Sequence, residues 1–301
     1  MNTAIKRFYN GVYLFLHATL PVNPFIPKKI NGNKVRNGHI RTEQEINPQL
    51  DELIIQQLSE QHLENFSYRI DIDAFRKYYS ETNYPMEYYG NKNGRDDNFI
   101  EKALEHFVSM QFLPLNKNCT LVDIGAGNSP FSEILCEKFE IKNSYKQDLS
   151  FAEGVHENKI GGRASCIPFD DCSIDAMTLH CSLEHFEGNE DLAFFKETER
   201  VLKKGGKCVV LPFYLSSQYT VHLDPVNNLL KSFTPVISDE GAVIRYCDSK
   251  QAFSRHYDVK TFRQRIINNT QGLNPGIYHV DNFKEVHADC YLRFILVMTK
   301  K

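Results

Sequence analysis

The chain has 301 residues, with 35 basic and 38 acidic side chains and a formal net charge of −3 at pH 7. This balance predicts no nucleic-acid partner and no attraction to an anionic membrane. The eight cysteines form no C-x-x-C pair, and no metal-ligand spacing occurs. We therefore expect buried reduced thiols, no metal site and a cytoplasmic protein.

Residues 1–95 are expected to form an accessory helical segment. Residues 12–16 are apolar and follow two basic residues, but the run is too short to span a bilayer and no cleavage site follows it. An amphipathic helix is the preferred interpretation there, and no integral membrane segment is predicted. Apolar residues at three- to four-residue spacing also favour helix over residues 46–80.

A helix over residues 98–112 leads into the most informative stretch, residues 119–150. Its first strand, residues 120–124, is broken by Gly125 and Gly127, and a helix begins near Ser129. A second strand ends at Asp148, 21 positions after Gly127. Strand, glycine turn, helix, strand and acid form the plan of a mononucleotide-binding βαβ unit. A turn without a ligand remains the alternative interpretation of this stretch alone.

The pattern continues with a strand over 174–180, a helix from about 189 that ends at the glycines 205 and 206, and a strand over 207–212. This alternation predicts an α/β fold, a mostly parallel sheet with helices on both faces. Residues 213–259 interrupt the pattern and are expected to form a lid or substrate-binding insertion. A helix over 260–269 and a strand over 291–299 complete the chain. Nothing in the pattern predicts an oligomeric state.

Five stretches together resemble the class I S-adenosylmethionine-dependent methyltransferases, in their small-molecule branch. They are Val122–Gly127 (VDIGAG), Gln147–Ser150 (QDLS), Cys166–Asp175 (CIPFDDCSID), Leu183–Phe186 (LEHF) and Glu199–Gly206 (ERVLKKGG). The resemblance implies a Rossmann-like domain over residues 96–301, with S-adenosylmethionine as cofactor. The implied reaction is O- or N-methylation of a small molecule or biosynthetic intermediate.

The resemblance also implies the residues that hold the cofactor. Asp123 is expected to support the methionine ammonium and Asp148 the ribose hydroxyls. The full set is Asp123, Gly125, Ala126, Gly127, Asp148, Leu149, Ala164, Ser165, His180 and Cys181. Arg163 departs from the family pattern, which often has an acid there to accept from the adenine amino group. Either the backbone near 164–165 binds adenine, or Arg163 points to solvent, or cofactor binding is altered.

His185 is the best candidate for a general base, because it follows the strand 174–180 and histidine titrates near neutrality. The candidate substrate-binding residues are Tyr88, Tyr89, Tyr219, His222, Arg255, His256 and Tyr257. Each has a plain packing or surface role as its alternative. Two other functions stay open. One is a catalytically inactive binding or scaffold protein. The other is a nicotinamide-dependent oxidoreductase, which is disfavoured because Pro130 stands where the dinucleotide pattern Gly-x-Gly-x-x-Gly has its third glycine.

Overall fold

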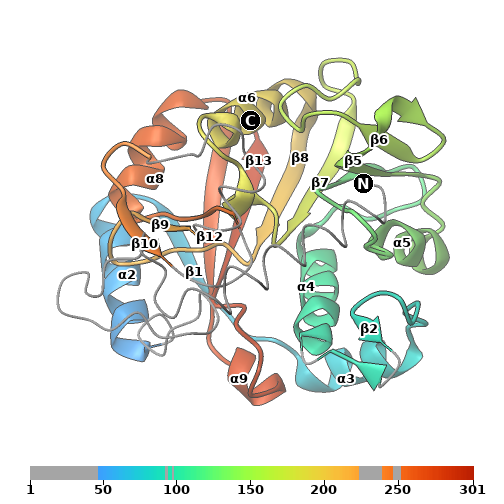
Figure 1. Ribbon diagram of the computed structural model, residues 1–301, viewed down its shortest axis with the longest axis horizontal. Helices are drawn as coiled ribbons and strands as arrows, with labels where there is room; N and C mark the ends of the chain where they lie inside the picture. The colour runs from blue at the N-terminus through green and yellow to red at the C-terminus, as the bar shows by residue number, and fades with distance from the viewer. Residues whose placement is uncertain (1–46, 92–93, 97, 224–238, 247–251) are drawn as a thin grey trace, which may run out of the picture.

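The computed structural model describes residues 47–301 except 92–93, 97, 224–238 and 247–251 (Figure 1). The helix expected around residues 12–16 lies outside this part of the chain. Among the described helices, none has the length and apolar character needed to cross a bilayer.

The centre of the fold is an eight-stranded sheet with the order β1-β12-β13-β8-β7-β4-β5-β6. Strands β8, β7, β4, β5 and β6 pair in parallel, whereas β13 is antiparallel to both of its neighbours. The strands are β1 (Glu64–Tyr68), β4 (Thr120–Ile124), β5 (Asn143–His156), β6 (Lys159–Gly161), β7 (Ile174–His180), β8 (Leu202–Leu211), β12 (Leu273–Val280) and β13 (Phe294–Lys300). The predicted α/β fold with a mostly parallel sheet is confirmed.

Helices cover both faces of this sheet, as predicted (Figure 1). One face packs on α2 (Pro48–Glu60), α6 (Glu190–Val201) and α8 (Val259–Arg265). The other packs on α3 (Ile72–Glu81), α4 (Phe99–Phe112) and α5 (Phe131–Phe139). The fold also contains several short elements: η1 (Leu183–His185), η2 (Ile267–Asn269), α9 (Phe283–Val286) and a hairpin formed by β2 (Gly90–Asn91) and β3 (Gly94–Arg95).

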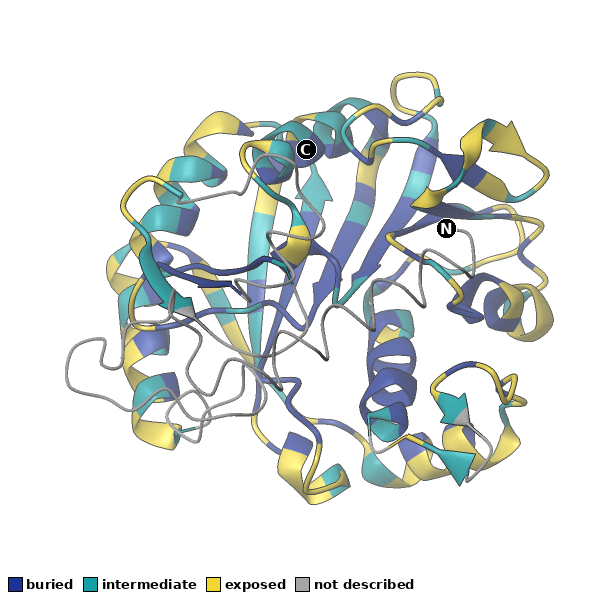
Figure 2. Ribbon diagram, viewed as in Figure 1, coloured by how far each residue is buried: buried dark blue, intermediate teal, exposed yellow. Residues whose placement is uncertain are grey.

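Strand alternation decides which side chains meet which helices. In β4, Val122 and Ile124 pack with the α6 face, and Leu121 packs with the α4 face. Asp123 has the same parity as Leu121, so it faces α4. Figure 2 shows that α4 and most of the sheet are buried. Polar side chains on this face of the strands are therefore withdrawn from water.

The region 46–80 is less helical than expected. Strand β1 separates α2 from α3 and pairs in parallel with β12, with Glu64 opposite Gly276. The helical expectation fails at residues 64–68 because their pairing partner lies near the other end of the chain. The described part of the N-terminal segment is thus joined to the sheet.

The structure also changes the expected end of helix α6 and adds detail to the insertion 213–259. Helix α6 ends at Val201, and residues 202–206, expected as its last turn, already belong to β8 through a register shift opposite β7. The insertion 213–259 contains a separate three-stranded sheet. We call it the cap sheet; it consists of β9 (Thr220–Leu223), β10 (Val243–Tyr246) and β11 (Ser254–His256).

Candidate functional site

The candidate site lies where the strand order reverses. From β4 the chain proceeds to β5 on one side, and β7 continues to β8 on the other. Ligands of open α/β sheets bind outside the carboxyl ends of the strands at this point. The residues that follow β4, Gly125–Gly127, and those that follow β7, Cys181 and Ser182, meet there.

The glycine turn after β4 makes two side-chain-to-backbone hydrogen bonds. Gly125 N donates to Gln147 Oε1 at 3.3 Å, and Gly127 N donates to Asp148 Oδ2 at 2.9 Å. Gly125 has a φ of +66°, and a Cβ placed on it would lie 2.6 Å from Ser182 Oγ. The turn therefore needs glycine at 125 both for its backbone angle and for its close approach to the loop after β7.

Asp148 is oriented by the backbone, because Ser150 N also donates to its Oδ1 at 2.8 Å. The side chain is only partly buried, and each carboxylate oxygen retains a lone pair for another donor. Its neighbour Leu149 is 76% exposed and presents an apolar surface beside the carboxylate. Ala126, by contrast, is buried inside the turn. This pattern fits a ribose at Asp148 with an apolar ring against Leu149.

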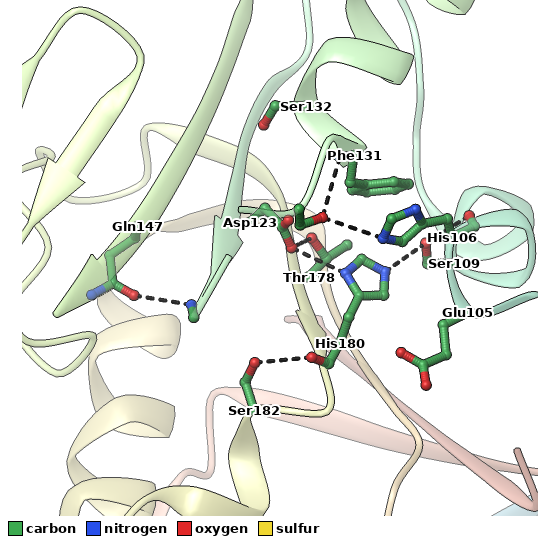
Figure 3. Close-up of polar contacts among 12 residues, drawn as sticks. Glu105, His106, Ser109, Asp123, Phe131, Ser132, Gln147, Thr178, His180 and Ser182 are labelled. Atoms are coloured by element: carbon green, nitrogen blue, oxygen red, sulfur yellow. Dashed lines mark hydrogen bonds and ion pairs between the residues drawn. The ribbon is translucent and has the colours of Figure 1, made fainter. Parts of the chain in front are cut away.

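Asp123 lies at the centre of a buried polar chain on the α4 face of the sheet. Its Oδ1 accepts from Thr178 Oγ1 at 2.8 Å and from His180 Nδ1 at 3.1 Å. His180 Nε2 lies 3.1 Å from Ser109 Oγ on α4. Figure 3 shows Asp123, Thr178 and His180 pointing toward one another, with Ser109 beyond. The second oxygen of Asp123, Oδ2, is buried, and no group in the described chain donates to it.

A second buried histidine on α4, His106, fixes the tyrosines that precede this helix. Its Nδ1 lies 3.0 Å from Tyr84 Oη, and its Nε2 lies 3.4 Å from Tyr88 Oη and 3.3 Å from Ser129 Oγ. Burial and the neighbouring His180 hold the pKa of His106 well below its usual range, so it is neutral. Tyr88 is therefore anchored at the beginning of α5, close to the glycine turn.

Sequence reasoning missed a cluster of ionisable side chains between α4 and the end of β7. Lys102 Nζ lies 2.8 Å from Glu105 Oε1 and 2.6 Å from Cys181 Sγ. The hydroxyls of Tyr291 and Tyr214 lie 3.5 and 3.8 Å from the same sulfur. Both Lys102 and Glu105 are almost fully buried. Their i, i+3 spacing on α4 was the only sequence sign of this cluster.

Burial decides the protonation of this cluster. It raises the pKa values of the Cys181 thiol and of the Tyr214 hydroxyl far enough to keep both neutral. For Lys102, burial alone would lower the pKa, but the negative charge of Glu105, 2.8 Å away, opposes this and the pKa of Lys102 is raised. Lys102 and Glu105 therefore form a charged pair. Tyr89, which is 37% exposed, lies against Lys102 with its ring 6.0 Å from Nζ.

The structure resolves the position of Arg163. Its Nη2 lies 2.5 Å from Glu190 Oε1 and its Nε 3.1 Å from Glu190 Oε2, at the first turn of α6. The Arg163 side chain is 66% exposed. Ser165 Oγ donates to the same carboxylate, and Ala164 between them is buried. Arg163 thus points outward into a surface ion pair, which leaves the backbone near 164–165 available.

His185, the proposed base, is held by the cap sheet. Its Nδ1 lies 2.7 Å from the carbonyl oxygen of Phe253, and its Nε2 lies 3.6 Å from Glu184 Oε1. The imidazole is 38% exposed, whereas the Glu184 side chain is 5% exposed. Glu184 Oε2 is a buried acceptor to which no described residue donates, and burial raises the pKa of this carboxyl.

Most of the residues expected at the substrate belong to the base of the cap sheet. Arg255 is fully buried; its Nη1 lies 2.9 Å from Asp191 Oδ2 and its Nε 2.7 Å from Asp239 Oδ2. Tyr257 donates to Asp191, and Tyr219 donates to Asp239. These contacts occupy the polar groups of all three residues and favour a structural role, so substrate binding by them stays a prediction.

The two cap-sheet histidines lie nearer to the candidate site. The ring of His256 stacks on Tyr214 with a centroid distance of 4.7 Å, and it contacts His222 at 4.6 Å. Burial, followed by His222, holds the pKa of His256 well below its usual range. Among the described residues, no three His, Cys, Asp or Glu side chains converge on a metal position.

The arrangement suits a ligand with a cation at one end and a nucleoside at the other. Asp123 Oδ2, to which no described residue donates, lies two residues before Gly125 and is a site for an ammonium group. The oriented Asp148 carboxylate and the exposed Leu149 are set for a ribose and a flat apolar ring. These observations fit the groups of S-adenosylmethionine.

Residues 122–210 match the family model described as "Methyltransferase domain". No curated protein matches the chain in sequence.

Solved structures with similar folds include the Burkholderia thailandensis 1,6-didemethyltoxoflavin-N1-methyltransferase with bound 1,6-didemethyltoxoflavin and S-adenosylhomocysteine. It is 10% identical, covers 89% of this chain and 94% of its own, and has a TM-score of 0.46. The Haemonchus contortus phosphoethanolamine N-methyltransferase 2 in complex with S-adenosyl-L-methionine is 14% identical. The match covers 75% of this chain and 60% of that protein, with a TM-score of 0.43. An S-adenosylmethionine-dependent methyltransferase from Mesorhizobium loti is 17% identical. The match covers 65% of this chain and 98% of that protein, with a TM-score of 0.40.

Proposed function

We propose that the acceptor of this S-adenosylmethionine-dependent methyltransferase is a small molecule methylated on oxygen or nitrogen. Residues 122–210 match the methyltransferase domain model, which supports the methyl-transfer activity. When bound, the cofactor supplies an electrophilic methyl group on a sulfonium. The protein contributes mainly proximity and orientation to such an in-line displacement. We propose residues 96–301 as the catalytic domain and 1–95 as an accessory segment.

One observation carries the cofactor assignment. Two carboxylates lie on adjacent strands beside the glycine turn, Asp123 near the end of β4 and Asp148 within β5 just past its pairing with β4. Asp148 is held by Gly127 N at 2.9 Å. Asp123 offers the buried, unpartnered oxygen. We assign the methionine ammonium to Asp123 and the ribose hydroxyls to Asp148. The loop after β7, which carries Cys181 and Glu184 and approaches the glycine turn through Ser182, would border a cofactor held in this way.

Calorimetric titration with S-adenosylhomocysteine tests this assignment. We expect binding by the wild-type protein and at least about a tenfold weaker Kd for Asp148→Ala, which loses charge-assisted hydrogen bonds to the ligand. Asp170→Asn, an exposed acid on the loop before β7, is the matched control and is expected to bind normally. Absence of binding by the wild type at millimolar ligand would refute the proposed function.

The inactive scaffold is the alternative function from another class. It drew support from Arg163, but that side chain now lies in a surface ion pair with Glu190 and leaves the cofactor residues intact. A protein that binds S-adenosylhomocysteine but transfers no methyl group to any amine or alcohol would favour this alternative.

A further inference from the structure

Glu184 is a buried carboxylate that lacks a hydrogen-bond donor for one of its oxygens within the described chain. It lies in η1, directly after the end of β7, and its side chain is 5% exposed. No described residue donates to Oε2. Burying a carboxylate oxygen without a hydrogen-bond donor is costly, so such an oxygen in a native site indicates a missing donor.

The surrounding charges do not balance Glu184. Glu184 interacts electrostatically with both Lys102 and Glu105. Among the described residues, Lys102 is the ammonium group that acts on Glu184, and it is already paired with Glu105 at 2.8 Å. Cys181 and Tyr214 are neutral because burial raises their pKa values.

The remaining cationic candidate is His185, and its geometry limits what it supplies. Its Nδ1–H donates to Phe253 O at 2.7 Å, which turns Nε2 toward Glu184 Oε1 at 3.6 Å. That distance exceeds a normal hydrogen bond, and the imidazole is partly exposed. His185 therefore faces one carboxylate oxygen of Glu184 and leaves the other oxygen, Oε2, without a donor.

We propose that the methyl acceptor is an amine, whose ammonium form binds against Glu184 Oε2, so that the reaction is an N-methylation. This inference rests on the proposed function and specifies its substrate class. An ammonium group supplies both the missing donor and the missing positive charge, whereas a hydroxyl supplies only the donor. The aromatic rings of Tyr214 and Tyr89, which line the same cluster, suit a cationic neighbour as well.

The protons and electron pairs of the proposed N-methylation are all accounted for by the amine, the cofactor, Glu184 and His185. An ammonium nitrogen has no lone pair, so it first gives one proton to the Glu184 carboxylate. Burial, which raises the pKa of Glu184, makes that carboxylate a better proton acceptor. The freed lone pair forms the N–C bond as the C–S bond breaks, its electron pair remains on sulfur, and the product is a methylated ammonium. His185, partly exposed and with Nε2 3.6 Å from Glu184 Oε1, is the group that can carry the proton from Glu184 to solvent once it approaches to hydrogen-bond distance.

The test compares Glu184→Gln with the wild type and with Glu187→Gln, a partly buried acid on the same loop. S-adenosylhomocysteine production is followed with matched primary amines and alcohols of the same carbon skeleton. We expect turnover with amines only, and a loss of about 100-fold or more in kcat/KM for Glu184→Gln. The affinity for S-adenosylhomocysteine should not change in either variant.

A second readout needs neither cofactor nor acceptor. If Glu184 is kept for a ligand, its uncompensated charge destabilises the free protein, and Glu184→Gln is expected to raise Tm. A structural role would lower it. Turnover confined to alcohols, no turnover with any amine, or a Tm drop in Glu184→Gln would each overturn the inference. Failure of the wild type to bind S-adenosylhomocysteine would instead refute the proposed function itself.

Discussion

Replacing Gly125 by alanine should destabilise the protein by two separable effects. The backbone at Gly125 has a φ of +66°, where a side chain costs about 1–2 kcal/mol. The new Cβ would also lie 2.6 Å from Ser182 Oγ and 2.8 Å from Ser182 Cβ. Overpacking of this kind costs about 1–3 kcal/mol. We therefore expect the free energy of unfolding to fall by about 2–5 kcal/mol in total.

A second glycine isolates the backbone effect. Gly188 has a φ of +57°, and a Cβ added there meets no atom within 4 Å. Gly188→Ala should therefore cost only about 1–2 kcal/mol. Because both atoms that crowd position 125 belong to Ser182, Ser182→Gly should remove the steric part. In that background Gly125→Ala is expected to cost about as much as Gly188→Ala.

Urea unfolding of the wild type, Gly125→Ala, Ser182→Gly and the double variant gives the coupling energy between residues 125 and 182. We expect a coupling of about 1–3 kcal/mol. Equal losses for Gly125→Ala and Gly188→Ala would show that the turn does not press on the loop after β7. A double variant no more stable than Gly125→Ala would contradict the steric argument as well.

Two further predictions concern ion pairs away from the glycine turn. Arg255→Met removes the fully buried guanidinium that pairs with both Asp191 and Asp239 and leaves Arg265 as their remaining cation. It should cost about 3–5 kcal/mol in urea unfolding, and a loss below about 1 kcal/mol would contradict the buried network. His279 has a pKa raised chiefly by its hydrogen bond to Asp51, so its stabilising contribution is complete below pH 6.5 and is lost as pH rises through the raised value. Stability measured from pH 6 upward should therefore fall more steeply in the wild type than in His279→Asn, and parallel pH profiles would refute this linkage.

The sequence predicted well those elements whose determinants are local. The strand, glycine turn and acid of residues 120–148 could be found because each feature depends on neighbours close in the chain. Asp123 and Asp148 accordingly lie on adjacent strands beside the glycine turn, although β5 continues to His156 and does not end at Asp148 as expected. Strand β1 could not be predicted, because the apolar spacing around residues 64–68 also fits a helix and its partner strand is distant.

The polar cluster was missed for a different reason. Lys102 and Glu105 are charged residues on a helix, and such residues are usually exposed. Only the docking of α4 against β7 and β8 buries them beside Cys181. Arg163 shows the converse. Its position in the motif left three interpretations open, and its ion pair with Glu190, 27 residues later, holds the side chain at the surface. Long-range pairing of this kind leaves no periodic trace in the sequence.

Because β1 pairs with β12, which lies more than 200 residues later, β1 cannot join the sheet until β12 has been synthesised. The seam continues past β1, where Ile70 N donates to Asn282 Oδ1, a contact between residues 212 positions apart. During translation, residues 64–68 must therefore wait, unpaired, until nearly the whole chain has emerged. This edge of the sheet can form only after β12 has been made, and β12 in turn reaches the parallel strands only through β13.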